Sequence, residues 1–562
     1  MPEKRWFVQK TNPDYIKYLS RAASVSAAFA QILVNRGINT PGDIKTFLDP
    51  AMGALSDPFE LSGMKEAVDV IRTAISSGRK ILVHGDYDTD GLTGTAIMVS
   101  ALKRLGAEVC YFIPERLTHG YGFNAPGVEY ARKAGAGLII TVDCGISSME
   151  AVRMATSEGM GVVVTDHHEP GRDVSNTPVL PEADAVINPR LCGEEAPALS
   201  GSAVAFKLAS ALLGHEASSD FLDLAALGTI ADVIPLIDES RAIVRHGLVL
   251  INEGLRPGIK ALKEVAGLNG RVVSAGRLAF TVIPRMNASG RIDNPLEVIK
   301  LLLSDDHAES AVIAERLHEL NLKRQSIEEE IHQEALSVLK EKGYDHSVVL
   351  ASDGWHEGVI GIVASRLAEA FYRPAFVFNI RDGIAKGSAR SIPSFDLYSG
   401  ISRCSDLLLS FGGHRQAAGL RLRIENLGKF EERINRVIAE TLSAEDLIPR
   451  LTIDATVELQ EVNFNLVKEI SLLEPLGCGN PEPRLGTKGL EVMGPRVVGN
   501  KHLKMRLKHR SCTVDAIGFS MGDMIGRIEP DAMVDAVYTP TINEWENRKT
   551  LQLHLRAFRP SA

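Results

Sequence analysis

The chain has 562 residues, of which 45% are hydrophobic and 24% charged, and its formal net charge is −9 at pH 7. This length exceeds what one hydrophobic core sustains, so we expect two to four domains. The composition is that of a folded globular protein, no stretch reaches the ~18 consecutive apolar residues of a membrane span, and the acidic balance means that any nucleic-acid surface must be local.

The six cysteines are scattered without a C-x-x-C pair. This pattern argues against a zinc ribbon or a disulfide framework and fits a reducing cytoplasm. The first stretch, MPEKRWFVQK, is charged and has no apolar core followed by a cleavage site, so a secretory signal is not expected. We therefore expect a cytoplasmic protein with no membrane association.

Short apolar runs alternate with helical patterns from about residue 79 to 190. Strands are expected at 80–86, 107–114, 137–145, 161–169 and 183–189. This alternation is typical of an α/β fold with a doubly wound parallel sheet, in which ligands collect at the carboxyl ends of the strands. The acidic and histidine clusters of the sequence fall at those ends.

The next stretch, 307–342, contains no Gly or Pro and many good helix formers, which predicts one long helix connecting two domains. A second strand-and-helix alternation follows, with strands expected at 347–352 and 375–380. Beyond about residue 448 the pattern becomes strand-rich, which favours a small β-barrel.

The stretch HGDYDTDG, residues 84–91, places three aspartates at alternate positions after an apolar run. A calcium-binding loop would need a bidentate Glu at its twelfth position, where the chain has Ile97. The stretch HEGVI (356–360) lacks the second His of a zinc-protease motif, because the fifth position is Ile360. Both of these metal-site hypotheses fail.

A better interpretation combines HGDYDTDG with three further stretches that place Asp or His after an apolar run: TVDCGIS (141–147), VTDHHEP (164–170) and LGTIADVIPL (227–236). Carboxylates and imidazoles suit Mn²⁺, Mg²⁺ or Zn²⁺. Two ions ~3.5–4 Å apart that share a carboxylate can clamp a phosphoryl displacement. Any single Asp is usually a helix cap or a loop carboxylate, but four such clusters favour a metal centre.

These four stretches resemble the DHH phosphoesterase superfamily, whose name describes the triplet Asp166-His167-His168. Four more stretches resemble the RecJ family of single-strand-specific exonucleases within that superfamily: IPRMNASGRI (283–292), GWHEGVIGIVASRL (354–367), KGSARS (386–391) and FGGHRQAAG (411–419). The resemblance in sequence is close over roughly residues 60–490. For the rest of the chain only the expected order of domains is similar.

The resemblance implies five parts: an N-terminal helical segment (1–65), a DHH phosphoesterase catalytic domain (66–305), a connecting helix (306–343), an α/β DHH-associated substrate-binding domain (344–445) and an OB-like nucleic-acid-binding barrel (446–562). It also implies a metal-dependent exonuclease that degrades single-stranded DNA from its 5′ end to 5′-mononucleotides, in DNA recombination and repair. Two Mn²⁺ or Mg²⁺ ions would activate the attacking water and offset charge on the phosphate.

By this resemblance one ion is held by His84, Asp88 and Asp143, and the other by Asp90, Asp143, His167 and Asp232, with Asp143 as the bridge. Alternation along the chain is expected to send Asp88 and Asp90 in similar directions. The catalytic candidates are Asp90, Asp143, His167 and His168. Of these, His168 is expected, together with Asp86 and Asp166, to orient ligands by hydrogen bonds or to contact phosphate. Cys144, next to the bridge, is a thiolate ligand or nucleophile in one interpretation and a small buried residue in the simpler one.

The resemblance also assigns candidate DNA contacts. Arg116, Ser388 and Arg390 match positions that hold a 5′-terminal phosphate, a task that suits the planar donors of arginine. Residues that resemble an entry path, or that can donate to phosphate, are Arg285, Asn287, Arg291 and His414. The alternatives are solvated surface arginines and, for Asn287, a loop-and-cap role.

In the expected barrel, KHLKMRLKHR alternates strictly, so Lys504, Arg506 and Lys508 form one basic face. Such a face suits tracking of a phosphate backbone, although a basic strand face alone more often serves solubility.

Two rival functions remain open from the sequence. A related DHH enzyme would cleave short RNA, cyclic dinucleotides or pyrophosphate, but the extra barrel and the long connector argue against these compact proteins. A DNA-binding scaffold without catalysis would lack ligands, whereas every expected position is filled. The partners implied by the resemblance are single-stranded DNA, single-stranded-DNA-binding protein and a RecQ-type helicase, and a monomer is expected.

Overall fold

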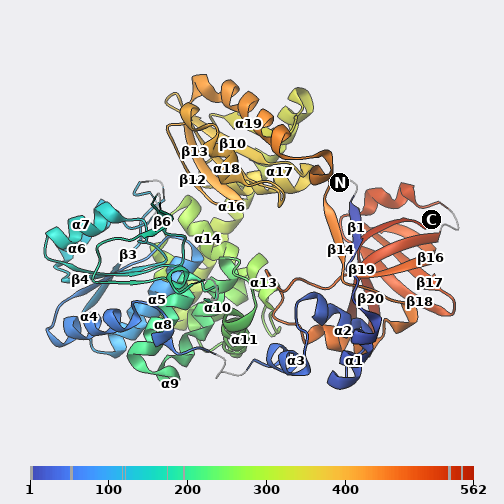
Figure 1. The fold of residues 1–562 in the computed structure, drawn as a ribbon, viewed down its shortest axis with the longest axis horizontal. Coiled ribbons are helices and arrows are strands. Elements are labelled where there is room, and N and C mark those ends of the chain that lie inside the picture. Colours follow the sequence, from blue (N-terminus) through green and yellow to red (C-terminus); the bar gives the residue numbers. More distant parts are fainter. Residues whose placement is uncertain are drawn as a thin grey trace.

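The computed structural model describes residues 4–50, 55–116, 118–120, 122–173, 175–193, 196–529, 533–545 and 548–561. Figure 1 shows a first α/β body on the left, a second α/β body at the top and a β-barrel on the right, with the N-terminal helices beside the barrel. Within the ranges given above, no helix is both long and apolar enough to cross a bilayer.

The first body is built on a parallel sheet with the order β3-β2-β4-β5-β8. Its strands are β2 (Ile81–His84), β3 (Val109–Phe112), β4 (Leu138–Val142), β5 (Gly161–Thr165) and β8 (Ala185–Ile187). One face packs on α4 (Met64–Ser76), α5 (Thr89–Arg104) and α8 (Gly201–Leu213), and the other on α6 (Ala125–Ala134) and α7 (Met149–Ser157). This is the predicted doubly wound sheet, because near-continuous apolar strands are buried on both faces.

A helical layer extends the same core beyond α8. It comprises α10 (Leu222–Ala231), α11 (Asp238–Glu253), α12 (Pro257–Val265), α13 (Ala275–Phe280), α14 (Val282–Ile292) and α15 (Leu296–Leu303). The predicted long helix is confirmed as α16 (His307–Lys342), which begins after Asp306, whose carboxylate caps the N–H groups of Ala308 and Glu309.

The second α/β body has the sheet order β12-β13-β11-β10-β9, in which only β9 and β10 are parallel. Its elements are β9 (Val348–Ser352), α17 (Ile360–Phe371), β10 (Ala375–Arg381), β11 (Ile384–Arg390), α18 (Leu397–Ser402), β12 (Ser410–Gly413), β13 (Ala417–Arg423) and α19 (Leu427–Thr441). The two strands expected from the sequence are β9 and β10.

The C-terminal strands close into the expected barrel, because β16 pairs with both β17 and β19. The barrel order is β16-β17-β18-β20-β19: β16 (Leu485–Val498), β17 (His502–His509), β18 (Cys512–Gly518), β20 (Arg548–Pro560) and β19 (Met533–Trp545). Closure removes the exposed sheet edges that would otherwise pair with other chains.

The N-terminal segment shares its core with the barrel. Its strand β1 (Arg5–Val8) pairs in parallel with β14 (Arg450–Ile453), and α1 (Pro13–Ala23), α2 (Ala27–Asn35) and α3 (Pro41–Leu48) contribute Leu19, Phe29, Ile32, Leu33 and Ile44 to the barrel's hydrophobic cluster. The segment is helical as expected, but it is also tied to the barrel by a strand that its charged sequence does not indicate.

A buried arginine joins the barrel to the first body. Arg241 of α11 is 1% exposed, and its guanidinium carbon lies 4.0 Å from the centre of the Phe47 ring. It donates to the carbonyl oxygens of Phe47 (2.8 Å), Leu473 (2.9 Å), Glu474 (2.8 Å) and Pro475 (3.1 Å). Since a buried cation needs such a full set of acceptors, this joint fixes the barrel against the sheet domain.

Candidate metal centre and adjoining pocket

The acidic and histidine stretches meet at the carboxyl edge of the first sheet. Asp86 follows β2, Asp143 follows β4 and the Asp166–His168 triplet follows β5. These strands are parallel neighbours, so their ends lie at one edge. Asp232 joins them from the end of α10, which packs against α5.

Two helix N-termini hold Asp88 and Asp90. Asp88 caps α5, and its Oδ1 accepts the N–H groups of Asp90 (3.0 Å) and Gly91 (3.1 Å). The Asp90 carboxylate accepts the N–H groups of Gly201 (2.6 Å) and Ser202 (3.0 Å) in the first turn of α8. Backbone N–H groups at a helix N-terminus attract carboxylate oxygens, so the starts of α5 and α8 fix the positions of both aspartates.

Three groups of side chains have ligand atoms within 4.8 Å of one another: Asp143–His167–His168, Asp90–His167–Asp232 and Asp86–Asp88–Asp143. Nε2 of His167 lies 3.1 Å from Oδ1 of Asp143, 3.6 Å from Oδ2 of Asp232 and 3.9 Å from Oδ2 of Asp90. Asp143 belongs to two of the groups, which is the position expected of a bridging carboxylate. The structure therefore gathers every expected ligand except His84.

The cluster contains buried polar atoms that no hydrogen bond satisfies within the part of the chain that the structure describes. These atoms are Oδ1 of Asp86, Oδ1 of Asp143 and Nε2 of His167. A buried acceptor without a partner is costly, and carboxylate and imidazole donors suit Mn²⁺ and Mg²⁺. The side chains therefore fit a pair of divalent cations, which would satisfy these atoms.

The crowding of carboxylates shifts their pKa values. Burial, with the charges of Asp90, Asp88, Asp86 and Asp232, raises the pKa of Asp143 well above its usual value. Burial and the charges of Asp90 and Asp88 raise the pKa of Asp232 to about 8. Burial lowers the pKa of His167, which keeps its imidazole neutral. Neutral imidazole and ionised carboxylate are the forms that bind metal, so a cation competes with protons here.

Asp166 organises the loop after β5. Its Oδ1 accepts the N–H groups of His167 (2.7 Å) and His168 (3.1 Å), and its Oδ2 accepts that of Ile146 (2.9 Å). Nδ1 of His168 lies 2.7 Å from the same Oδ1. Burial alone would lower the pKa of His168, but Asp166 and the nearby carboxylates raise it to about 9. Asp166 thus orients both histidines, as expected from the sequence.

His84 is the one predicted ligand that lies elsewhere. Its ring sits 5.3 Å from that of Phe112 and 5.1 Å from that of Phe123, and its Nδ1 is 3.8 Å from the sulfur of Cys144. Burial lowers the pKa of His84 to about 4. The strand sends His84 to the same face as Leu82, towards α6, so we leave it out of the proposed ligand set. The alternation predicted through Asp90 also fails, because α5 begins at Thr89.

Close backbone approaches lock the cluster. Asp143 has a φ of 62°, a left-handed conformation that is uncommon outside glycine and is frequent at functional sites. A Cβ on Gly201 would collide with the Asp143 side chain, and one on Gly228 would collide with Oδ1 of Asp90 and Oγ of Ser202. The ligands therefore depend on two helical glycines that make no contact with a metal themselves.

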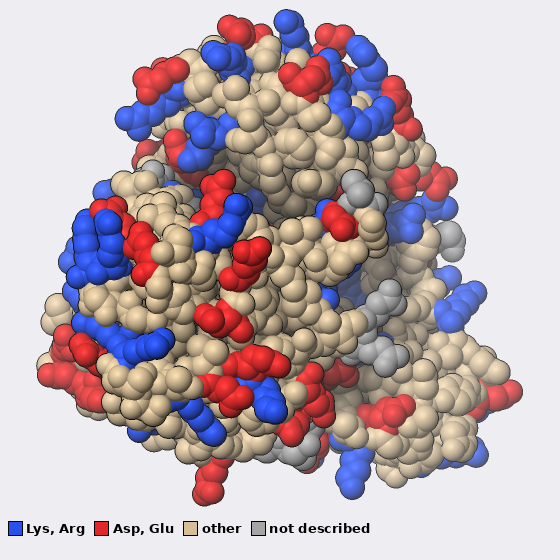
Figure 2. All heavy atoms as spheres, turned by 60° about the vertical axis from the view of Figure 1, so that its left-hand side comes forward, with Lys and Arg blue, Asp and Glu red and all other residues tan. Residues whose placement is uncertain are grey.

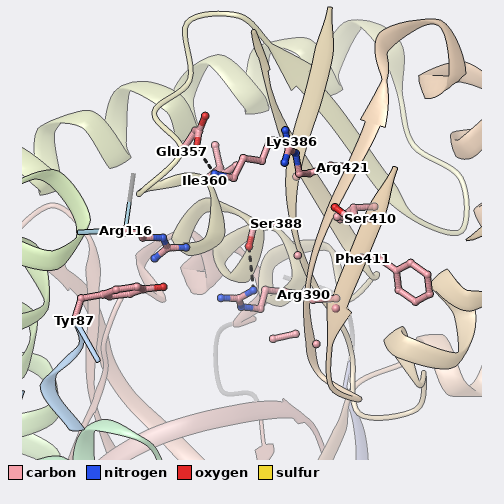
Figure 3. A pocket seen from close by; sticks show the side chains of 17 residues that line it. Tyr87, Arg116, Glu357, Ile360, Lys386, Ser388, Arg390, Ser410, Phe411 and Arg421 are labelled. Atoms are coloured by element: carbon pink, nitrogen blue, oxygen red, sulfur yellow. Dashed lines mark hydrogen bonds and ion pairs between the residues drawn. The ribbon is translucent and has the colours of Figure 1, made fainter. Parts of the chain in front are cut away.

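A cavity of about 530 Å³ lies beside the cluster, between the two α/β bodies. Tyr87 and Arg116 line it from the first body, and Ser388, Arg390 and Lys386 line it from β11 (Figure 3). Figure 2 shows the surface hollowed between the upper body and the one below it. The structure thus brings together the three residues expected at a terminal phosphate, namely Arg116, Ser388 and Arg390.

The other predicted DNA contacts differ in their placement. Arg291 lies next to Arg116 and Arg390; burial and these neighbouring charges lower its pKa to about 10. Asn287 accepts the N–H and the hydroxyl of Thr89, each at 2.9 Å, so it caps α5 in the way the alternative interpretation expects. Arg285 donates to the carbonyl of Thr281 (2.6 Å), and His414 is exposed outside the cavity lining.

The basic face of β17 forms as predicted. Leu503, Met505 and Leu507 are buried, whereas Lys504, Arg506 and Lys508 lie on the other side, with Arg506 exposed. Lys508 forms an ion pair with Glu491 at 2.9 Å, so part of this face is neutralised.

Sequence reasoning missed the N-terminus of α8 and the wall residue Tyr87. The signal for α8 was present, because Ser200 is a good N-cap before an apolar run and its hydroxyl accepts the N–H of Ala203. Tyr87 lies between two metal-ligand candidates, and the guanidinium carbon of Arg116 sits 5.6 Å from its ring centre. Because Tyr87 stands within the acidic stretch, the sequence drew attention to its aspartate neighbours and gave no indication that Tyr87 lines the cavity.

We predict that Gly228→Ala weakens Mn²⁺ binding by about 10- to 100-fold, because the added methyl displaces Asp90 and Ser202. Isothermal titration with Mn²⁺ measures the effect, and circular dichroism checks that the fold is kept. The matched control is Gly276→Ala in α13, where the added Cβ meets nothing within 4 Å. Equal Mn²⁺ affinity in the two variants would contradict this role of Gly228.

We also predict that the metal-free protein loses stability as pH rises towards about 8, and that Mn²⁺ raises the melting temperature more at about pH 8.5 than at about pH 6. Asp232 has a pKa of about 8 when folded and 3.8 as its ordinary value, so the folded state holds the extra proton in this window. The raised pKa of His168 acts with the same sign. Thermal melts in chelator and in Mn²⁺ test this, and a pH-independent Mn²⁺ effect would refute it.

Three family models match the chain: the DHH family N-terminal domain over residues 80–229, the DHHA1 domain over 345–440 and the RecJ OB domain over 453–557. These matches fall on the first body, the second body and the barrel.

Full-length relatives agree with these models. The single-stranded-DNA-specific exonuclease RecJ of Bacillus subtilis is 39% identical over 98% of this chain and 70% of its own length. The crystal structure of Thermus thermophilus RecJ with Mn²⁺ matches with a TM-score of 0.86 at 33% identity, over 99% of this chain and 80% of that one. The Mg²⁺ complex of the same protein gives a TM-score of 0.80 at 31% identity, over 99% and 79%. This chain therefore belongs to the RecJ family.

Proposed function

We propose that this chain is a metal-dependent exonuclease that degrades single-stranded DNA from its 5′ end to 5′-mononucleotides. The observation that carries the proposal is the buried carboxylate and imidazole cluster, with its unsatisfied atoms, beside a basic cavity. The family supports it, because the relatives carry the name single-stranded-DNA-specific exonuclease.

Two divalent ions, Mn²⁺ or Mg²⁺, fit the cluster, with Asp86, Asp88 and Asp143 as one ligand group and Asp90, His167 and Asp232 as the other. The Thermus relative is described in complex with each of these ions. Such ions lower the pKa of water and offset charge on a phosphate in an in-line displacement. The chain's own part is to fix the ligands through the N-termini of α5 and α8.

The cavity supports recognition of a 5′ phosphate. Arg116, Ser388 and Arg390 face it from opposite bodies, and Arg291 adds charge behind them. Guanidinium groups hold phosphate oxygens in a fixed, charge-assisted geometry. Because Tyr87 on the cavity wall lies between Asp86 and Asp88 in the chain, a phosphate bound here sits beside the cluster. The next phosphodiester of the strand then lies over the carboxylates, which gives cleavage from the 5′ end.

His168 supports the same reaction. Its pKa of about 9 keeps the imidazole protonated at neutral pH, and a protonated imidazole can donate a hydrogen bond to a phosphate oxygen. Asp166 fixes the ring so that this donor is positioned before the substrate binds.

The barrel is proposed to hold more distant parts of the strand along Lys504, Arg506 and Lys508, supported by their common face on β17. Binding of single-stranded-DNA-binding protein or a RecQ-type helicase and a monomeric state stay predictions from the family resemblance. A cytoplasmic location stays a prediction from the cysteine pattern and the charged first stretch.

We predict that Asp232→Asn lowers the rate of nucleotide release from 5′-phosphorylated single strands by on the order of 100-fold, because it removes a ligand charge while keeping the shape of the side chain. Asp232 makes no hydrogen bond with its side chain in the described part of the chain, so the fold should persist. Release of mononucleotides in Mn²⁺ or Mg²⁺, with and without chelator, measures the effect. The control is Asp305→Asn on the exposed surface. Equal activity on blunt duplex, or turnover in chelator, would refute the proposed function.

We predict that Arg390→Gln raises the KM for 5′-phosphorylated strands about tenfold and leaves 5′-hydroxyl strands nearly unchanged, since it removes one charge-assisted contact. Arg381→Gln is the control, because Arg381 is exposed on the same sheet and does not line the cavity. Initial rates on the two kinds of end test this. A variant that still prefers phosphorylated ends as strongly as the wild type would remove Arg390 from end recognition.

A further inference from the structure

The cavity continues past the residues proposed for the terminal phosphate. Arg390, Ser388 and Lys386 alternate along β11 and so share one face, with Lys386 about 13 Å from Arg390 and about 7 Å from Ser388 along the strand. Arg390 lies on the side of the cavity near the metal-ligand cluster. Arg291 interacts electrostatically with both Arg390 and Asp88, so these two residues lie on either side of it. Lys386 therefore marks the end of the cavity that is far from the metal centre (Figure 3).

A second group of cations lies at this far end. Arg421 of β13 is the direct cross-strand partner of Lys386, and Ser410 of β12 is the partner of Arg421 in turn. All three line the cavity. Lys386 forms an ion pair with Glu357 at 2.6 Å, whereas the guanidinium of Arg421 has no hydrogen bond or ion pair within the described residues. Like charges directly opposite one another destabilise a sheet. Glu357 offsets the charge of Lys386, so Arg421 is the cation of this pair that remains available to an anion, and Lys386 can join it by exchanging Glu357 for that anion.

The cavity floor between the two groups is open. Ser388 pairs with Gly419, which pairs with Gly412, and a Cβ added at either glycine meets nothing within 4 Å. The volume of about 530 Å³ lies within the ~300–1,000 Å³ range of small-molecule sites, which is more than one phosphate group needs. A strand that ends in a single 5′ phosphate at Ser388 and Arg390 leaves the Arg421 guanidinium without an anionic partner among the described residues.

We propose that Lys386, Arg421 and Ser410 form a second anion subsite that receives the outer phosphates of a 5′-polyphosphorylated end. This inference rests on the proposed function, since it takes Arg116, Ser388 and Arg390 as the site of the innermost phosphate. The ligand class is a nucleic acid strand, or a free nucleotide, that carries a 5′-di- or triphosphate.

The first cleavage of a strand with a 5′ triphosphate then differs from that of a strand with a 5′ monophosphate only in the nucleotide released. Water adds its oxygen to the phosphorus of the first internucleotide link, the bond from that phosphorus to the 3′ oxygen breaks, and a proton passes to the 3′ oxygen. The terminal residue leaves as a nucleoside 5′-triphosphate with a 3′ hydroxyl. The remaining strand carries a 5′ monophosphate and is degraded as before.

The test compares single strands of one sequence that carry a 5′ triphosphate, a 5′ monophosphate or a 5′ hydroxyl. Binding is measured by fluorescence anisotropy in chelator, and the first product is identified by mass spectrometry in Mn²⁺. The variants are Arg421→Gln and Lys386→Gln. The control is Arg423→Gln, which changes an exposed arginine two residues further along the same face of β13 and outside the cavity lining. Inorganic tripolyphosphate and a nucleoside triphosphate serve as competitors, to distinguish strand ends from free polyphosphates.

We expect the wild type to bind the triphosphate end at least as tightly as the monophosphate end and to release a nucleoside triphosphate first. Each variant should weaken binding of the triphosphate end about tenfold, as loss of a charge-assisted contact predicts, and change the monophosphate end less than twofold. Arg423→Gln should change neither. Equal weakening of both ends by the variants, or rejection of the triphosphate end by the wild type, would overturn the subsite. If the monophosphate end is not degraded either, the proposed function itself has failed.

Discussion

The metal site is built around carboxylates that repel one another, and the protein's own hydrogen bonds offset only part of this repulsion. Five carboxylates converge on one edge of a sheet, where burial and mutual charge raise the pKa values of Asp143 and Asp232. The backbone compensates Asp88 and Asp90 through the N-termini of α5 and α8. It gives no such partner to Oδ1 of Asp86 or Oδ1 of Asp143. The fold therefore stabilises Asp88 and Asp90 itself, whereas Asp86 and Asp143 each keep an oxygen that a bound cation would stabilise.

Because backbone N–H groups must reach the carboxylates, α8 and α10 pack closely beside the cluster. Gly228 leaves room for Asp90 and Ser202 where α10 meets the start of α8, and Gly201 leaves room for the Asp143 side chain. The apolar face of α5 and the polar atoms at its start belong to the same helix, so core packing and ligand geometry are coupled. A rigid core thus holds the carboxylates in place against their repulsion, which is the condition for a preorganised metal site.

The sequence predicts what depends on local periodicity and on residue type. The parallel sheet, α16 and the barrel follow from apolar runs and helical patterns, and Asp and His at the strand ends predict a metal centre there. The assignment of individual ligands came from the family resemblance. The resemblance includes His84 among the ligands, whereas the structure packs its ring against Phe112 and Phe123. The alternation expected from Asp88 to Asp90 fails because α5 begins at Thr89. Ser200 marks the start of α8, but the helix contributes backbone N–H groups to the site, and every residue type except proline carries these, so the sequence does not mark that helix start as part of the site. The shared core of α2 and the barrel joins segments more than 400 residues apart and leaves no local signal.

In the cavity beside the carboxylate cluster, positive charges repel one another instead of negative ones. Arg116, Arg291 and Arg390 lie near one another. Burial, together with the charges of its neighbours, lowers the pKa of Arg291 to about 10, which still leaves it charged at neutral pH. Arg291 also donates to the carbonyl of Gly358 at 3.2 Å, so the same side chain helps to hold the second body against the first. A phosphate bound among these cations would relieve their repulsion and strengthen that contact. A phosphate bound there would therefore act on a residue that joins the two bodies, whereas the metal-ligand candidates all lie in the first body.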